Sequence, residues 1–213
     1  VHQLWGMSEL QAGAFTRPGE PAELRLGFAG RGAPETTLRI GDGDHPLPQG
    51  AEGELQVKGP SVFAGYLDDA EASAAAFTRE GWFRSGDLAV MEVSGHIRIT
   101  GRLKELINRG GVKFNPIDVE ELVTRHPGVA QCAIVPMPDA RLGEIACCFI
   151  APRHPASPPS LAELQAFLFS QGLAKTRWPE QLEILAELPM TPTRKVRKGE
   201  LTKRAALLRS GPG

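Results

Sequence analysis

The sequence predicts an α+β fold in two parts that join near the middle of the chain. Up to residue 101, short runs of alternating apolar and polar residues lie between glycine and proline turns, a pattern typical of antiparallel β-structure. Beyond that point, helical segments alternate with longer apolar strands. A charged segment with two adjacent glycines, Gly101–Pro116, separates the two patterns. We therefore expect a small antiparallel β part at 1–101 and a compact α+β domain at 102–213.

The first part is expected to hold short strands and one helix. The pair Asp42-Gly43 is typical of a hairpin turn, and Ser94-Gly95 reads as a two-residue loop between two apolar runs. The alanine-rich segment 70–78 favours a helix. Strands are expected early in 1–20, before a loop that ends at Pro18-Gly19, and at 24–30, 37–40, 53–59, 88–93 and 96–100.

The second part begins at the charged joint. Leu106-Ile107 is long enough for one short strand, and the two glycines after Arg109 predict a tight turn, because glycine readily adopts positive φ. Asn115-Pro116, followed by acidic residues, is a typical helix start. Helices are expected at 117–126, 161–170 and 198–208, with Ser160 as the cap of the second, and strands at 129–136, 144–151 and 181–185.

Composition excludes several classes of protein. The net charge of −1 gives no electrostatic case for binding nucleic acid, and no apolar run reaches the roughly 20 residues of a membrane-spanning helix. Cys132, Cys147 and Cys148 lie in apolar runs without metal-ligand spacing, which favours buried thiols in a reducing cytoplasm. The first residue, Val1, is not an initiator, and we expect a piece of a longer protein. The oligomeric state is left open.

Familiar catalytic motifs are missing from the sequence. No segment fits the phosphate-binding loop G-x-x-x-x-G-K-[ST] or the dinucleotide motif G-x-G-x-x-G. The five histidines are scattered, without zinc spacing. Gly6-Met7-Ser8-Glu9 lacks the second glycine of a nucleophile elbow.

Two short segments of the first part combine residue types that suit a nucleotide site. Trp5-Gly6-Met7-Ser8-Glu9 offers an aromatic ring, a hydroxyl and a carboxylate, which suit stacking on a base, contact with a phosphate and binding of Mg²⁺. The same residues also fit an ordinary strand-to-turn junction. Asp87 follows Gly86 and suits the two hydroxyls of a ribose, although Gly-Asp is a common turn.

Two further segments suit catalysis and domain movement. Lys195 ends a proline-rich loop, Pro189–Lys195, where a point charge suits an oxyanion or a phosphate. A solvated basic tail explains the same lysine, because residues 194–209 hold seven Lys or Arg. The joint at Gly101–Pro116 is interpreted as a hinge in an enzyme.

In this order, the segments resemble the motifs of the adenylate-forming superfamily, which includes acyl-CoA synthetases, peptide-synthetase adenylation domains and luciferase-like enzymes. WGMSE is similar to Y-G-x-T-E, and FRSGDL to [YF]-R-T-G-D-L. The stretches from Gly53 to Tyr66, from Gly101 to Glu121 and from Pro189 to Lys195 are similar to three further motifs. The resemblance covers nearly the whole chain.

The resemblance implies a two-step reaction. ATP and a carboxylic acid give an acyl-adenylate and pyrophosphate, and a thiol, usually that of coenzyme A, then displaces AMP. It therefore implies ATP, Mg²⁺ and coenzyme A as cofactors and a small carboxylic acid as the substrate. The chain is expected to be the end of the large domain followed by the whole small, mobile domain. The phosphate loop and most of the acyl pocket lie upstream in the family, so the acid cannot be named and the 213-residue chain alone is expected to be inactive.

The resemblance also assigns roles to single residues. Trp5 would pack on adenine beside Gly6, Ser8 would contact the α-phosphate, and Glu9 would hold Mg²⁺. Asp87 would bind the ribose hydroxyls, with Arg102 beside them.

Four residues of the second half of the chain receive roles in the same way. Lys104 would be the hinge, Gly110 and Gly111 would line the path of pantetheine, and Lys195 would bridge the carboxylate and phosphate oxygens. Arg194 stands where the family has glycine. Arg109-Gly110-Gly111 with Asn115-Pro116 resembles the CoA-ligase version of the hinge motif more than the peptide-synthetase version. A stand-alone or peptide-synthetase-like adenylation enzyme, and a fragment that keeps only the fold, are the alternatives.

Overall fold

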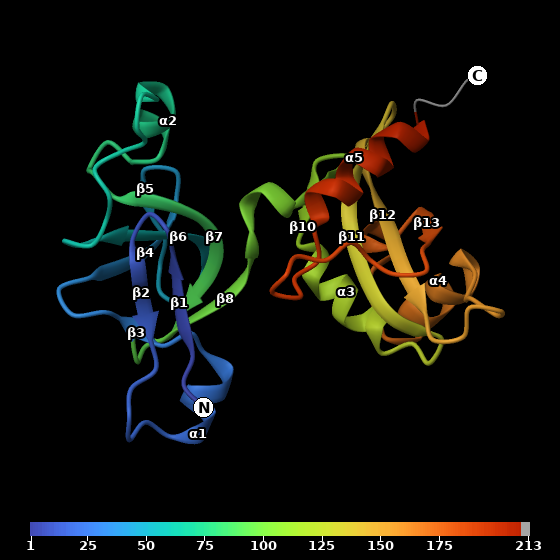
Figure 1. Ribbon diagram of the computed structural model, residues 1–213, viewed down its shortest axis with the longest axis horizontal. Coiled ribbons are helices and arrows are strands. Elements are labelled where there is room, and N and C mark those ends of the chain that lie inside the picture. Colours follow the sequence, from blue (N-terminus) through green and yellow to red (C-terminus); the bar gives the residue numbers. More distant parts are fainter. Residues whose placement is uncertain (210–213) are drawn as a thin grey trace. The chain divides into compact units, whose positions relative to one another are not determined.

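The computed structural model describes residues 1–209 and divides into two compact units, Val1–Lys104 and Glu105–Gly213 (Figure 1). Each unit has its own buried core. The sequence placed the boundary slightly earlier, between residues 101 and 102. The interpretation of the units as a large-domain remnant and a mobile small domain stays a prediction.

The first unit consists of two antiparallel sheets and short helices. Its elements are β1 (Leu4–Met7), β2 (Gln11–Phe15), α1 (Ala22–Gly27), β3 (Arg31–Gly32), β4 (Thr37–Asp42), β5 (His45–Pro46), β6 (Glu52–Lys58), α2 (Ala70–Ala75), β7 (Phe83–Met91), β8 (Ile97–Arg102) and the 3₁₀ turn Leu103–Glu105. One sheet has the strand order β1-β2-β3 and the other β5-β4-β6-β7-β8.

Strand β6 is buried on both faces, although its two faces differ in chemistry. Leu55 and Val57 are fully buried in the apolar core, as the alternating pattern predicts. The intervening Glu54 and Gln56 are also buried and therefore need polar partners. Arg84 pairs with Glu54, and Arg39 donates to Gln56.

Two predictions for the first unit are wrong. Residues 24–30, predicted as a short strand, begin within the helix α1, in which no residue is buried. Residues 11–15, predicted as part of a loop, form β2, because they pair with β1 and β3. Tertiary pairing decides the structure of 11–15, whereas 22–27 forms a short helix and only Ala29 and Gly30 after it bond to Ile97.

The second unit is an α+β domain built on one mixed sheet. Its elements are β9 (Ile107–Arg109), β10 (Val112–Phe114), α3 (Pro116–Thr124), β11 (Val129–Asp139), β12 (Gly143–Pro152), α4 (Leu161–Ser170), the 3₁₀ turn Lys175–Arg177, β13 (Gln181–Ile184) and α5 (Lys198–Arg209). Strand β12 pairs antiparallel with β11 and β9 and parallel with β13. The α+β prediction is confirmed.

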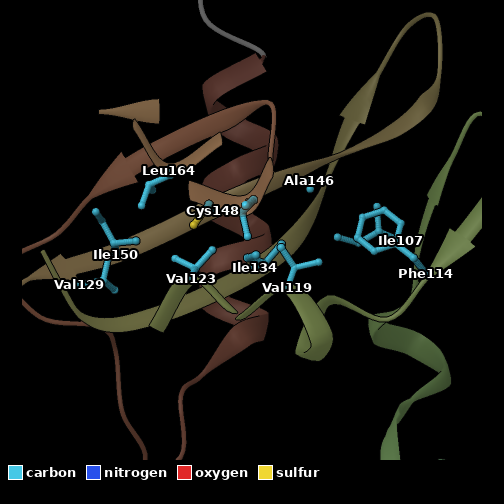
Figure 2. Packing of buried hydrophobic residues seen from close by; sticks show 11 residues of the cluster. Ile107, Phe114, Val119, Val123, Val129, Ile134, Ala146, Cys148, Ile150 and Leu164 are labelled. Atoms are coloured by element: carbon cyan, nitrogen blue, oxygen red, sulfur yellow. The ribbon is translucent and has the colours of Figure 1, made fainter. Parts of the chain in front are cut away.

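Helices cover both faces of this sheet. Ala146, Cys148 and Ile150 of β12 pack in one cluster with residues of α3 and α4 (Figure 2). Alternate residues of the same strand, Cys147 and Phe149 among them, pack in a second cluster with residues of α5. Because β12 is covered on both faces, its sequence is continuously apolar rather than alternating.

Local signals set the starts of two helices. The Asn115 side chain accepts a hydrogen bond from the Ile117 N–H at 3.1 Å, and Pro116 occupies the first turn of α3. Ser160 and Glu163 form a reciprocal capping box at α4. Both helix starts were predicted, and the structure confirms them.

The three cysteines are free thiols. Burial raises the pKa of Cys147 to about 12. Cys132 and Cys148 lie with their sulfurs 3.7 Å apart, and their mutual hydrogen bond, together with burial, raises the pKa of Cys132. Within residues 1–209, no helix is long and apolar enough to cross a membrane.

Candidate functional site

Three predicted nucleotide-binding residues meet in the first unit. Trp5 of β1 donates from Nε1 to Asp87 Oδ2 at 2.8 Å, although the two residues are 82 positions apart. Asp87 of β7 lies opposite Arg102 of β8 in the sheet register, and Arg102 Nε is 2.8 Å from Asp87 Oδ1. Residues from three separate motifs are thus assembled around one carboxylate.

The carboxylate at the centre of this cluster is almost fully enclosed. The side chain of Asp87 is 5% exposed, whereas that of Arg102 is 48% exposed. Although Arg102 Nε is close, its approach is not aligned for a hydrogen bond, and Asp87 Oδ1 receives none from the described residues. Because the Arg102 guanidinium offsets the charge of this oxygen without donating a hydrogen bond, a ligand hydroxyl can donate to the oxygen once the exposed Arg102 side chain moves aside.

Trp5 itself lies in the apolar core of the unit and is 7% exposed. Its six-membered ring lies directly over Gly13, where an added Cβ would be 2.3 Å from the ring. The indole therefore holds Asp87 from the protein side. Stacking of Trp5 on adenine stays a prediction.

Gly6 has a structural role in the β1–β2 hairpin. A Cβ added at this position would lie 1.8 Å from the Gln11 carbonyl oxygen. Only glycine fits there, because the two strands approach too closely for any side chain. The predicted role of Gly6 at the nucleotide is neither required nor excluded by this geometry.

Ser8 and Glu9 lie on the turn between β1 and β2. Ser8 is exposed, and Glu9 is half-buried with its Oε1 accepting from the Tyr66 hydroxyl at 3.1 Å. Burial and this contact with Glu9 raise the pKa of Tyr66. A single carboxylate suits Mg²⁺, which usually takes one or two carboxylates and completes its shell with phosphate oxygens and water. The described residues hold no cluster of three or more candidate metal ligands.

The segment before Asp87 is fixed by a buried glutamate that the sequence analysis did not assign to a role. Glu54 accepts from Arg84 Nε at 3.0 Å and from the Gly86 N–H at 3.1 Å. Ser85 donates to the Leu55 carbonyl and accepts from the Asp87 N–H. These bonds fix the backbone that presents Asp87. The acidic Glu54 within the alternating pattern of β6 was the signal that the sequence offered.

Gly110 and Gly111 form the two-residue loop of the β9–β10 hairpin, with φ of +58° and +89°. Two positive φ angles define the hairpin turn that favours glycine, so the turn alone explains both residues. The Gly110 N–H donates to the Leu142 carbonyl at 2.8 Å, while the space beside Gly111 is open to 4 Å. An open backbone edge is compatible with the predicted pantetheine path.

Arg109, directly before this turn, anchors it to the segment that leads into β13. Its Nε and Nη2 donate to the two carboxylate oxygens of Glu180 at 3.0 and 2.8 Å. The hydrogen bond to Glu180 raises the pKa of Arg109 despite partial burial. This two-point contact keeps the glycine turn in a fixed place on the second unit.

Lys195 lies on a tightly closed loop. The Thr191 N–H donates to the Lys195 carbonyl at 2.8 Å, and the Lys195 N–H donates to Thr191 Oγ1 at 3.0 Å. The side chain of Lys195 is exposed and forms no ion pair with any residue of the described chain. The backbone is thus ordered while the ammonium stays available to a ligand.

Arg194 adopts φ of +60°, the left-handed conformation that favours glycine. Arg194 thus has a backbone conformation that glycine adopts without strain, at the position where the resemblance expects glycine. The strain of a side chain in this conformation is about 1–2 kcal/mol.

Lys104 is the last residue of the first unit and lies in the 3₁₀ turn Leu103–Glu105. It is exposed, and none of residues 1–209 forms an ion pair with it. A residue with few restraints at a boundary suits a hinge.

Two family models match the chain and together cover more than half of it. The AMP-binding enzyme model matches residues 1–67, and the AMP-binding enzyme C-terminal domain model matches residues 118–195. The two models occur in the order of the two units.

Curated relatives match over almost the whole chain. The medium-chain fatty-acid–CoA ligase of Escherichia coli is 35% identical over 94% of the chain and 36% of the ligase. The 2,3-dihydroxybenzoate-AMP ligase of Bacillus subtilis is 38% identical over 94% of the chain and 37% of that protein. The sulfoacetate–CoA ligase of Cupriavidus necator is 36% identical over 96% of the chain and 40% of that enzyme. The chain thus spans about two fifths of the length of these relatives.

Solved structures show the same fold. The ATP-bound crystal structure of MatB from Rhodopseudomonas palustris matches with a TM-score of 0.87 and 29% identity, over 96% of this chain and 40% of that one. The amide bond synthetase McbA from Marinactinospora thermotolerans matches with a TM-score of 0.78 and 30% identity, over 95% and 42%. The chain belongs to the superfamily of AMP-binding, adenylate-forming enzymes and matches the C-terminal part of its members.

Proposed function

We propose that this chain is the C-terminal part of an ATP-dependent carboxylic acid:CoA ligase, which forms an acyl-adenylate and then an acyl-CoA thioester. The observation that carries the proposal is the assembly of Trp5 and Arg102 around the buried carboxylate of Asp87. The relatives, which include CoA ligases and other adenylating enzymes, support the reaction class.

In this proposal the first unit binds the nucleotide. Asp87 accepts hydrogen bonds from the ribose hydroxyls after Arg102, whose side chain is half exposed, has swung away. Ser8 and Glu9 lie on one turn, where the exposed hydroxyl would contact the α-phosphate and the half-buried carboxylate would hold Mg²⁺. Mg²⁺ would neutralise charge on the phosphates.

The second unit then serves both half-reactions. Lys195 supplies a positive charge to the carboxylate and phosphate oxygens as negative charge develops during adenylation, so no nucleophilic side chain is needed. Gly110 and Gly111 line the path of the incoming thiol, and the space beside Gly111 is open. Rotation at Lys104 exchanges the arrangement that brings Lys195 to the phosphates for the arrangement that brings Gly110 and Gly111 to the thiol. Location in the cytoplasm stays a prediction that the free thiols favour.

Coenzyme A is the thiol acceptor that we favour, because the Gly110-Gly111 pair resembles the CoA-ligase hinge motif. A stand-alone adenylating enzyme is the second candidate. It is favoured by the 38% identity to 2,3-dihydroxybenzoate-AMP ligase, which exceeds the 35% and 36% identity to the two CoA ligases named above.

The test is a pyrophosphate-exchange screen of carboxylic acids with the full-length protein, followed by a thioester assay with coenzyme A. The proposal expects exchange that depends on one class of acid and a CoA thioester of that acid. Exchange without a thioester would favour the second candidate, and no exchange with any acid would exclude both.

The hinge has its own test. Lys104→Pro fixes φ at the joint and should slow thioester formation about tenfold or more while pyrophosphate exchange is retained. The matched control is Lys104→Ala, which leaves the backbone free to rotate. A proline at Lys113 would not serve as a control, because Lys113 lies within β10. Unchanged thioester formation in Lys104→Pro would refute the hinge role.

A further inference from the structure

Lys198, the first residue of α5, has surroundings that the roles above do not explain. Its side chain is 19% exposed, and Nζ lies 2.9 Å from Glu120 Oε1 and 3.0 Å from Glu105 Oε2. The start of a helix has partial positive charge, so a lysine there is unfavourable on its own. The two carboxylates offset this cost and make Lys198 the centre of a half-buried ion cluster.

The cluster connects distant parts of the second unit. Glu105 follows Lys104 directly in the chain, and Glu120 lies on α3. Glu120 also accepts the backbone N–H of Ile134 on β11 at 2.6 Å. One ammonium group therefore links the first residue of the unit, helix α3 and the start of α5, with β11 attached through Glu120.

The electrostatics keep this ammonium charged. Burial lowers the pKa of Lys198, but the charges and hydrogen bonds of Glu120 and Glu105 outweigh it and raise the pKa overall. Buried ion clusters are often no more stabilising than apolar side chains of the same size. Stability alone is therefore a weak reason for this arrangement.

The loop of Lys195 is joined directly to the cluster. The Arg197 N–H donates to the Pro189 carbonyl at 2.8 Å and closes the base of the loop, and Met190 pairs with Val196 above it. Lys198 is the next residue after this base. The closed loop that holds Lys195 thus joins the chain directly at Lys198.

We propose that Lys198 is a positioning residue for adenylation: through Glu105 and Glu120 it fixes the Lys195 loop to the segment that follows Lys104. The loop then moves as one body with the unit when the hinge turns, and Lys195 returns to the same place in each cycle. The inference rests on the proposed function. The inference goes beyond the proposed function because it gives Lys198, Glu105 and Glu120 a role in positioning Lys195.

The test uses the full-length enzyme and measures each half-reaction separately. The variants are Lys198→Met, which removes the charge at similar size, Lys198→Arg, which restores it, and Glu105→Gln, which cuts only the link to the hinge. The matched control is Glu200→Gln, which breaks the exposed ion pair between Glu200 of α5 and Arg197, the residue before this helix. Pyrophosphate exchange, thioester formation from a supplied acyl-adenylate and the melting temperature are measured for each.

Lys198→Met is expected to lower kcat of pyrophosphate exchange about tenfold or more with little change in KM for ATP, because a misplaced catalytic group costs rate rather than binding. Glu105→Gln should show a smaller loss of the same kind, and Lys198→Arg should recover most of the activity. Thioester formation from the supplied adenylate should stay near the wild-type rate, and Glu200→Gln should behave as wild type.

Equal loss in both half-reactions, or losses that follow the melting temperature alone, would show a purely structural role and overturn the inference. Unchanged exchange in Lys198→Met and Glu105→Gln would overturn it as well. If the wild-type enzyme shows no exchange with any acid, the proposed function fails and the inference fails with it. If the wild type is active and the variants exchange pyrophosphate at the same rate, only the inference is overturned and the proposed function stands.

Discussion

The two units present their candidate residues in opposite ways. In the first unit, Asp87 is 5% exposed and is held by Trp5, Arg102 and a segment that Glu54 fixes. In the second unit, Lys195 extends from an ordered loop into solvent without an ion-pair partner among the described residues. The difference suits a fixed nucleotide site in one unit and a charge that the other unit delivers for one step.

The largest effect is expected at the exposed residue. Lys195→Ala in the full-length enzyme should lower pyrophosphate exchange about 10²–10³-fold, because it removes charge from the developing transition state. Thioester formation from a supplied acyl-adenylate should survive. Lys203→Ala, an exposed lysine of α5, is the control and should leave both rates unchanged. Equal loss of both steps in Lys195→Ala would contradict the proposal that Lys195 supplies its charge to adenylation alone.

A change beside the buried Asp87 of the first unit should weaken the binding of ATP. Trp5→Phe keeps an aromatic ring but removes the donor to Asp87, so the carboxylate loses orientation. We expect KM for ATP to rise about tenfold, equivalent to 1.4 kcal/mol, with a lower melting temperature. Trp82→Phe is the matched control, since Trp82 contacts Arg39 and Lys58 only through its ring. A change in kcat with unchanged KM would argue against a binding role.

The glycine turn allows backbone strain to be separated from ligand access. Gly111→Ala and Gly143→Ala both place alanine at positive φ, +89° and +75°, with no atoms within 4 Å of the added Cβ. Each should cost about 1–2 kcal/mol of unfolding free energy. Only Gly111→Ala should also slow thioester formation. Equal effects of both variants on that rate would remove the pantetheine role and leave the turn as the whole explanation.

The smallest effect is expected at Arg194. Arg194→Gly relieves the left-handed strain at φ +60° but adds freedom to the unfolded chain, so the net gain in stability is at most about 1 kcal/mol. Pyrophosphate exchange should not fall. Glu35→Gly, in a turn of the first unit with φ +60°, controls for the backbone effect. A clear loss of exchange in Arg194→Gly alone would show that the arginine charge itself acts on the phosphates.

Much of the local structure could be predicted because its causes lie within a few residues. The cap at Ser160, the helix start at Asn115-Pro116 and the Gly110-Gly111 turn follow from side-chain hydrogen bonds and backbone preferences that need no distant partner. The strand predicted at 24–30 is wrong because Ala22–Gly27 forms a short helix, and only Ala29 and Gly30, which follow it, hydrogen-bond to Ile97 of β8.

The sequence by itself determined the α+β class, the order of the elements and the motifs that mark an adenylate-forming enzyme. Only the tertiary structure decided which residues meet: the indole of Trp5 with Asp87, and Lys198 with Glu105 and Glu120. These partners are 82, 93 and 78 residues apart in the sequence, and local backbone or side-chain preferences act only over a few residues. They come together because the sheets and helices must bury their apolar faces, and that packing brings the charged groups into reach.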